Sequence, residues 1–271
     1  MNTIMVATDL SASAHWATDY ALELASRLRA RLVIVHAYDP LPNTAPAHEW
    51  MSSTAEAEYH VAVRKLNRLR RSIIKTTKGA VGVLVIARPG SPATVIANEA
   101  STQQADLLVM GVVGSEPLKA RQLGSLATDM ITHAPVSMLL VPPGATFHQP
   151  KNMVLAVDLS EPVNAIAIDS ALRFASLMQA SLDVVCVEDE PDATEQKAAR
   201  QLRDLLRHQP HTFSFLPGLD VALALADYLA NHKADLIMLL PKPHSRLRTW
   251  LLESVTQEVA RLSTLPVLAA V

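Results

Sequence analysis

The sequence predicts an α/β fold of two similar domains, each a doubly wound, five-stranded parallel sheet with helices on both faces. Apolar runs of strand length alternate with segments of helical periodicity along the chain, which is the pattern of layered α/β structures. The runs are apolar on both sides, as in strands that helices cover on both faces. The alternation then starts again halfway along the chain, which indicates a duplicated domain.

Composition limits the class of protein. The chain has 271 residues, enough for two domains, and its 49% of hydrophobic residues can fill two cores. A formal net charge of −2 gives no global field toward nucleic acid or anionic membrane. The lone Cys186 excludes an internal disulfide and a cysteine-rich metal site. With no export signal and no apolar stretch of about 20 residues, we expect a cytoplasmic protein that does not enter a membrane.

The first half of the chain carries the elements of one domain. Its first apolar run ends in Thr-Asp and leads into a helix with Trp16, Tyr20, Leu24 and Leu28 on one face. A proline-bearing loop follows the second run and precedes a long helix. The expected strands cover residues 3–10, 31–38, 80–87, 105–111 and 136–141, and the expected helices cover about 11–30, 54–78, 91–104 and 125–133.

The second half repeats this order. The sequence ATDLS at 7–11 returns as AVDLS at 156–160, and ADLLVM at 105–110 returns as ADLIML at 234–239. The second copy is about 20 residues shorter between its second and fourth strands. The segment PPGATFHQPK separates the copies. We therefore predict domains at 1–143 and 151–271, joined by a linker at 144–150 and related by a pseudo-two-fold axis.

Residues suited to ligand binding follow the first and fourth strands. In a sheet of order 3-2-1-4-5 the strand order reverses between these two strands, and ligands bind beyond the carboxyl ends at such a reversal. Asp9 follows the first strand and Gly111 ends the fourth. The Asp9 carboxylate could accept hydrogen bonds from both ribose hydroxyls or cap the next helix, and its residue type alone favours the cap.

Glycines after the fourth strand have the spacing Gly111-x2-Gly114-x9-Gly124-Ser125. Glycine lets backbone N–H groups approach a phosphate without a Cβ in the way, and the helix after Gly124 would direct its N-terminal amides at that phosphate. The Ser125 hydroxyl could donate to a phosphate oxygen or cap the helix, and capping is favoured by residue type alone. The spacing is neither a Walker loop nor the dinucleotide fingerprint.

This pattern resembles the ATP-binding universal stress proteins. The resemblance rests on G-x2-G-x9-G-S after DLLVMG, on TDLS after the first strand and on the final HAPVSMLLVP, and it covers the chain as a tandem pair of such domains. It implies bound ATP, with Mg²⁺ as a companion through the phosphates. It assigns the ribose to Asp9, the adenine to the backbone of Ala37, the pocket wall to Met110 and Gly111, and the phosphates to Gly114, Gly124, Ser125 and the amide of Leu126.

The second copy lacks the glycines. Leu240, Pro243 and Glu253 stand where the first copy has Gly111, Gly114 and Gly124, and only the serine returns, as Ser254. Proline has no N–H to offer a phosphate, and a glutamate carboxylate would repel it. We therefore predict one nucleotide per chain, in the N-terminal domain.

The predicted function is that of a cytoplasmic stress-response regulatory protein that binds ATP and changes conformation with it. A slow ATPase or phosphotransfer enzyme is one alternative, although Lys119 and Arg121 supply charge without a general base or paired carboxylates. A nucleotide-independent interaction module is the other. No catalytic residue and no metal site is assigned. A homodimer and an unknown protein partner stay open.

Nucleic acid is not an expected partner. The helix at 54–78 carries a basic stripe at helical spacing, and we interpret it as a solvated face opposite the apolar Leu66, Leu69 and Ile73. Interleaved aromatic residues and a basic net charge, which would support nucleic-acid binding, are missing. The stripe consists of Arg64, Arg68, Arg71 and Lys75.

Overall fold

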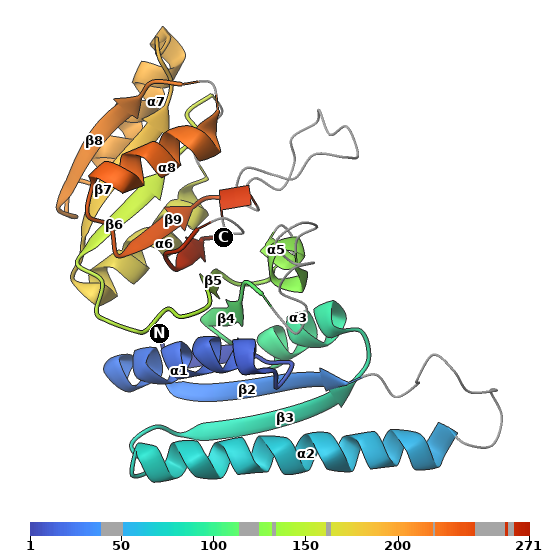
Figure 1. Cartoon of the computed structure of the whole chain (residues 1–271). Coiled ribbons are helices and arrows are strands. Elements are labelled where there is room, and N and C mark those ends of the chain that lie inside the picture. Colours follow the sequence, from blue (N-terminus) through green and yellow to red (C-terminus); the bar gives the residue numbers. More distant parts are fainter. Residues whose placement is uncertain are drawn as a thin grey trace. The chain divides into compact units, whose positions relative to one another are not determined.

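The computed structural model describes residues 1–38, 51–113, 125–131, 134–160, 164–218, 220–241, 258–259 and 263–271, without the side chains of residues 13 and 51–55. The chain divides into two compact units (Figure 1). The N-terminal unit comprises Met1–Met130 with Ala134–Phe147, and the C-terminal unit comprises Ile131–His133 with His148–Val271. Each unit is described by itself.

The N-terminal unit is a five-stranded parallel sheet of order β3-β2-β1-β4-β5. The order reverses between β1 and β4, as predicted, and both are central strands with buried residues. The long helix α2 lies along β3 (Figure 1). The elements are β1 (Thr3–Ala7), α1 (Ala12–Leu28), β2 (Arg31–Tyr38), α2 (Met51–Thr76), β3 (Val83–Pro89), α3 (Pro92–Thr102), β4 (Leu107–Gly111), α5 (Leu126–Met130) and β5 (Met138–Val141).

The C-terminal unit has the same parallel topology, in the order β10-β9-β6-β7-β8. Numbered from its own first strand, this order is again 3-2-1-4-5, so the predicted fold class is confirmed in both halves. Its elements are β6 (Asn152–Ala156), α6 (Ala165–Met178), β7 (Ser181–Val187), α7 (Ala193–Leu205), β8 (His211–Leu216), α8 (Val221–Asn231), β9 (Leu236–Leu239) and β10 (Val267–Ala269).

The first helix of each unit ends in the same way. The repeated Ala-Ser pair, at 25–26 in α1 and 175–176 in α6, supplies the carbonyls that accept the last N–H groups of the helix end. Three residues after the serine, Arg29 follows α1 and Gln179 follows α6. Both lie in the left-handed region, with φ of 54° and 57°. A left-handed residue ends a helix and satisfies its free carbonyls. The shared dipeptide therefore marks a shared turn toward the second strand.

The Ala-Asp dipeptide before the fourth strand of each copy also has a structural role. Asp106 Oδ2 accepts the backbone N–H groups of residues 2 and 3, and Asp235 Oδ2 accepts those of residues 151 and 152. Burial by itself would raise the pKa of Asp235, but the two backbone N–H donors and the neighbouring His148 outweigh it and lower the pKa. Each aspartate thus ties the start of the unit's first strand to its fourth.

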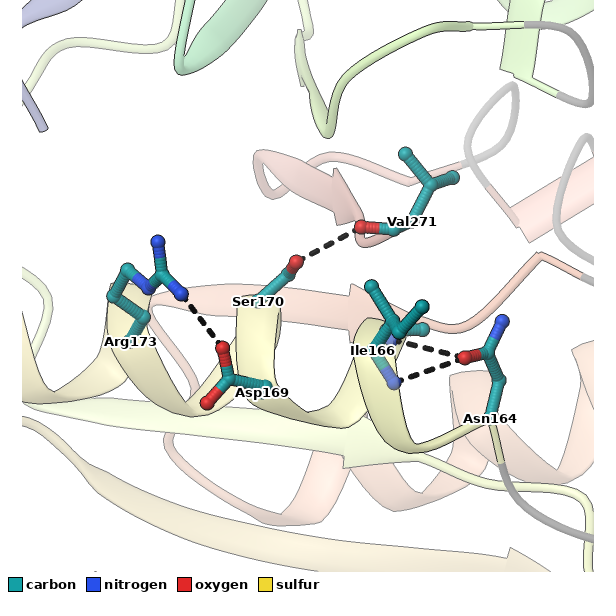
Figure 2. Close-up of polar contacts among 7 residues, drawn as sticks. Asn164, Ile166, Asp169, Ser170, Arg173 and Val271 are labelled. Carbon is teal, nitrogen blue, oxygen red and sulfur yellow. Dashed lines mark hydrogen bonds and ion pairs between the residues drawn. The ribbon is translucent and has the colours of Figure 1, made fainter.

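The two units cap their first helices differently. In α6 the cap is Asn164, whose Oδ1 accepts the N–H groups of Ile166 at 3.0 Å and Ala167 at 3.3 Å (Figure 2). Further along the helix, the Ser170 hydroxyl donates to the Val271 carbonyl at 2.8 Å. In α1 the cap is Ser11.

Some predicted boundaries are wrong. The third strand begins at Val83 instead of residue 80. It lies at the sheet edge and is less buried than the central strands, with Leu84 42% exposed. The helix after the glycines begins at Leu126 instead of residue 125 and is described to Met130, while the predicted end at residue 133 lies outside the described residues. The basic stripe of α2 is exposed, as predicted, opposite the buried Leu66 and Ile73. In the described ranges, no helix has the length and apolar character required to cross a bilayer.

Candidate functional site

A pocket of about 160 Å³ opens at the carboxyl ends of the strands of the N-terminal unit. It lies where β1 and β4 meet and the strand order reverses. Six predicted site residues line it, and the other two, Gly114 and Gly124, lie outside the described residues. The six are Asp9, Ala37, Met110, Gly111, Ser125 and Leu126.

Asp9 lies in the tight connection between β1 and α1. Its Oδ1 accepts the Ser11 N–H at 2.9 Å, and the carboxylate is exposed at the pocket. The helix cap is Ser11, whose hydroxyl oxygen accepts the Ala14 N–H at 3.2 Å. The interpretation of Asp9 as the cap is therefore wrong. One of its oxygens braces the connection, while an ionised carboxylate has acceptor sites beyond this single bond.

The connection is held in a defined shape by its own backbone and by β2. Thr8 donates its N–H to the Val35 carbonyl at 2.9 Å, and its Oγ1 accepts the Leu10 N–H at 3.0 Å. Leu10 has a φ of 62°, in the left-handed region that residues with a side chain rarely adopt. Such a conformation persists where surrounding contacts hold it, and it reverses the chain just after Asp9.

Ala37 presents backbone groups where the β1–β2 ladder stops. The paired register of these strands ends at Ala7 and Val35. Backbone groups along a central strand point alternately to its two neighbours, and the Val35 carbonyl points to β1. The N–H and C=O of Ala37 therefore point to the same side, beyond the last pair. They lie at the pocket, available to a planar ring that needs one donor and one acceptor.

Ser125 caps the short helix α5. Its Oγ accepts the Thr128 N–H at 3.4 Å, while its own N–H donates to Thr128 Oγ1 at 2.9 Å. The capping interpretation of Ser125 therefore holds. A hydroxyl that accepts one hydrogen bond keeps its own O–H to donate, so capping leaves it a donor for a ligand.

Sequence reasoning missed the wall contributed by α3. Pro92 and Ile96 line the pocket from this helix, and Ala14 lines it from α1. The available signal was the topology: after β3 the chain crosses back over the sheet, so the first turn of α3 lies beside the reversal. The missed lining residues are Ala7, Thr8, Ala14, Val35, Pro92, Ile96, Val113 and Ala127.

A partly buried ion pair joins this wall to the sheet. Arg88 Nε of β3 donates to Glu99 Oε1 of α3 at 2.6 Å, and Gln103 Nε2 donates to the other carboxylate oxygen at 3.3 Å. The Glu99 side chain is only 9% exposed, whereas that of Arg88 is 56% exposed. The hydrogen bond and the charge of Glu99 raise the pKa of Arg88. The pair holds α3 against the strand next to Ala37, which is the register partner of Arg88.

The corresponding edge of the C-terminal unit differs. Leu240 follows β9 where Gly111 ends β4, and Cys186 occupies the β7 position of His36 in β2. Cys186 is buried. Its pKa is raised to about 11, mainly because burial disfavours the thiolate. Pro243, Glu253 and Ser254 lie outside the described residues. No potential metal site with three or more His, Cys, Asp or Glu side chains occurs in the part of the chain that the structure describes.

Comparison with known proteins places this geometry in a family. The family model described as the universal stress protein family matches residues 1–142. A putative universal stress protein of Staphylococcus aureus (strain USA300) is 29% identical over 140 residues, which cover 51% of this chain and 82% of the relative.

Solved structures are also similar to this chain, and one of them shares the fold over almost its whole length. A universal stress protein from Archaeoglobus fulgidus DSM 4304 matches 99% of this chain and 96% of its own, with a TM-score of 0.73 at 15% identity. A universal stress protein solved in complex with cAMP matches 53% of this chain and 98% of its own, with a TM-score of 0.41 at 26% identity. The strand order, the pocket at its reversal and the family match over residues 1–142 lead to one conclusion: the chain belongs to the universal stress protein family.

Proposed function

We propose that this protein is a cytoplasmic regulatory protein that binds ATP in its N-terminal domain, residues 1–143. The observation that carries the proposal is the convergence of Asp9, Ala37 and Gly111, from three different strand ends, on one pocket. A carboxylate, a pair of backbone hydrogen-bonding groups and a residue without a side chain are chemically suited to a ribose, an adenine edge and a nearby phosphate.

Each part of the nucleotide has a matching group. The ribose hydroxyls donate to Asp9, whose Oδ1 already holds the connection in place. The adenine meets the N–H and C=O of Ala37 against the apolar Val35, Pro92 and Ile96. The phosphates extend toward Gly111 and the Ser125 hydroxyl, with Met110 and the Leu126 amide beside them. Gly114 and Gly124 complete this part of the proposal from the sequence, and Mg²⁺ would accompany the phosphates.

The C-terminal domain, residues 151–271, does not bind ATP in this proposal. Leu240 places an isobutyl group at the strand end where Gly111 leaves space. Pro243 and Glu253 remove a donor and add a negative charge at positions that match Gly114 and Gly124. The linker at 144–150 joins a nucleotide-binding domain to one without this ligand.

The proposed activity is conformational. A bound nucleotide shifts a protein toward the state that binds it more tightly, and no chemical step is required. Asp9 is the one acidic side chain among the pocket-lining residues that the structure describes, and its carboxylate is assigned to the ribose. A slow ATPase and a nucleotide-independent interaction module are the competing functions, and turnover and binding measurements separate them.

The experiment starts from the purified full-length chain. Denaturation and analysis of the supernatant identify any co-purified nucleotide, and calorimetric titration of ATP into the wild type measures affinity. Gly114→Val should abolish binding, whereas Pro243→Val, the matched change in the second copy, should leave it unchanged. If ATP binding is saturable, unaffected by Gly114 variants and removed by a Glu253 variant, the site lies in the C-terminal domain instead. Absence of binding by the wild type would reject the proposal.

The enzyme alternative is tested in the same samples. Release of inorganic phosphate from ATP is followed over hours with Mg²⁺ present. Binding without turnover excludes the enzyme, and turnover that Gly114→Val abolishes would replace the regulatory function with an ATPase.

A further inference from the structure

His36 contacts the connection that carries Asp9 from the neighbouring strand. Its Nδ1 lies 2.8 Å from the Thr8 carbonyl oxygen, and His36 itself is half-buried in β2, one residue before Ala37. A carbonyl oxygen only accepts hydrogen bonds, so Nδ1 carries the proton and donates it. The bond therefore fixes the ring tautomer, with the hydrogen on Nδ1 in the neutral imidazole.

The Thr8 carbonyl lies at the first bend of the chain after β1. In a longer ladder this carbonyl would accept the Ala37 N–H, because the Thr8 N–H donates to Val35. The ladder instead ends at the Ala7–Val35 pair, and the His36 ring satisfies the carbonyl. Both backbone groups of Thr8, the residue before Asp9, are therefore held by β2. The Thr8 N–H donates to the Val35 carbonyl, and the Thr8 carbonyl accepts from the His36 ring.

The C-terminal unit shows what is specific to the histidine. There the Val157 N–H donates to the Val185 carbonyl, and the register ends at the equivalent pair, although Cys186 replaces His36. The histidine is therefore not what ends the ladder. Cys186 has no ring N–H to donate, and Val157 lacks the hydroxyl with which Thr8 accepts a later N–H.

We propose that His36 is a positioning residue for ligand selectivity: its Nδ1–H holds the Thr8 carbonyl and so fixes the β1–α1 connection with the Asp9 carboxylate directed to the ribose. This inference rests on the proposed ATP site and adds a residue that does not touch the ligand. Because His36 acts through Asp9, its loss affects the recognition of the ribose hydroxyls more than the binding of the base or the phosphates.

Two variants separate this role from general stability. His36→Cys places the residue of the second copy in the first and removes the ring donor. His36→Asn keeps a donor, because the asparagine amide nitrogen occupies nearly the place of Nδ1. Cys186→Ala in the C-terminal unit is the matched control and should behave as wild type in every measurement.

The first measurement is the ratio of the dissociation constants of 2′-deoxyATP and ATP, by calorimetry. A hydrogen bond from a hydroxyl to a charged carboxylate corresponds to a preference for ATP of about tenfold or more in the wild type. His36→Cys should bring this ratio close to one, as Asp9→Ala should, and His36→Asn should keep it. The ratio cancels a loss of affinity that both nucleotides share.

The second measurement uses the nucleotide-free protein. Hydrogen exchange at the Leu10 and Ser11 amides should be faster in His36→Cys and unchanged in His36→Asn, with the α7 amides as an internal reference. A His36→Cys protein with the wild-type ratio and wild-type exchange would overturn the inference. If the wild type binds no ATP, the proposed function fails, and the exchange measurement alone decides whether His36 positions the connection.

Discussion

The connections after the first strand of each unit share one turn and differ in how the carboxylate is used. Asp9 and Asp158 each accept the N–H of the serine two residues on, at 2.9 Å in both cases. The Ser11 hydroxyl oxygen then caps α1, whereas the Ser160 hydroxyl donates back to the same Asp158 oxygen at 2.6 Å. The aspartate turn is thus a feature of the fold, and the two units differ in whether the serine hydroxyl oxygen caps the helix or the serine hydroxyl donates to the aspartate.

The other side of the reversal differs by the size of one side chain. β4 ends at Gly111, which lines the pocket, and β9 is followed by Leu240. Both units keep the aspartate that ties the first strand to the fourth, so the sheet itself is maintained where the glycine is not. The aspartate that holds the sheet is thus kept independently of the glycine assigned to the proposed ATP site, and exchanging residues between the two units tests this separation directly.

The largest effect is expected from Gly111→Leu, which places the residue of the second copy in the first. The leucine side chain would occupy a pocket of about 160 Å³ at the proposed phosphate end. ATP affinity measured by calorimetry should fall at least about 100-fold. Leu240→Gly is the matched control and should neither create a second site nor change the stoichiometry. Unchanged affinity in Gly111→Leu would separate the pocket from nucleotide binding.

The next effect concerns the thiol that stands in place of His36. The pKa of Cys186 is raised from 9.0 to about 11, so at pH 8 its thiolate fraction should be about 100-fold below that of the unfolded chain. Alkylation by iodoacetamide should be slower by at least this factor in the native protein, and it should rise with pH to about 11 instead of levelling near 9. Equal rates in native and urea-unfolded protein would show an accessible, unperturbed thiol.

A smaller effect is expected at the ion pair that occurs beside the pocket. Arg88→Ala leaves the largely buried Glu99 carboxylate with Gln103 alone, whereas Glu99→Gln leaves an arginine that water already reaches. We expect Arg88→Ala to cost about 2 kcal/mol of the free energy of unfolding and Glu99→Gln less than this. Urea denaturation measures both, and the reverse order would show that the carboxylate is better solvated than the structure indicates.

The smallest effect compares the paired aspartates. Asp235→Ala should cost about 1 kcal/mol, because the N–H groups that it frees lie near the surface, and Asp106→Ala should cost a similar amount in the other unit. The pKa of Asp235 is lowered below its usual value near 3.8, so its stabilisation is present above that pH and is lost as the pH falls through the native pKa. Thermal melts between pH 5 and about 2 should therefore converge for Asp235→Ala and wild type. If the melting temperatures of Asp235→Ala and wild type still differ at about pH 2, the side chain stabilises the unit by packing and not by its charge.

The bounds of a strand were predictable from the sequence where the strand is buried on both faces. The run at 31–38 coincides with β2 because a central strand between two helix layers is apolar on both sides. The start of β3 was not predictable in the same way, since an edge strand faces solvent and its apolar pattern extends past the paired residues. Residue type alone favoured Asp9 as the helix cap, because aspartate and serine are both preferred caps, and only the left-handed turn at Leu10 places Ser11 there.

By itself, the sequence determined the duplicated α/β pattern, the positions of Asp9 and of the glycine that ends the fourth strand, and the loss of that glycine in the second copy. These are properties of periodicity and of residue type, which a chain carries locally. Only the tertiary structure decided that Pro92 and Ile96 line the pocket, that Glu99 meets Arg88, and that His36 holds the Thr8 carbonyl. Such contacts join residues that are far apart in the chain, and they depend on strand order and register, which no local pattern specifies.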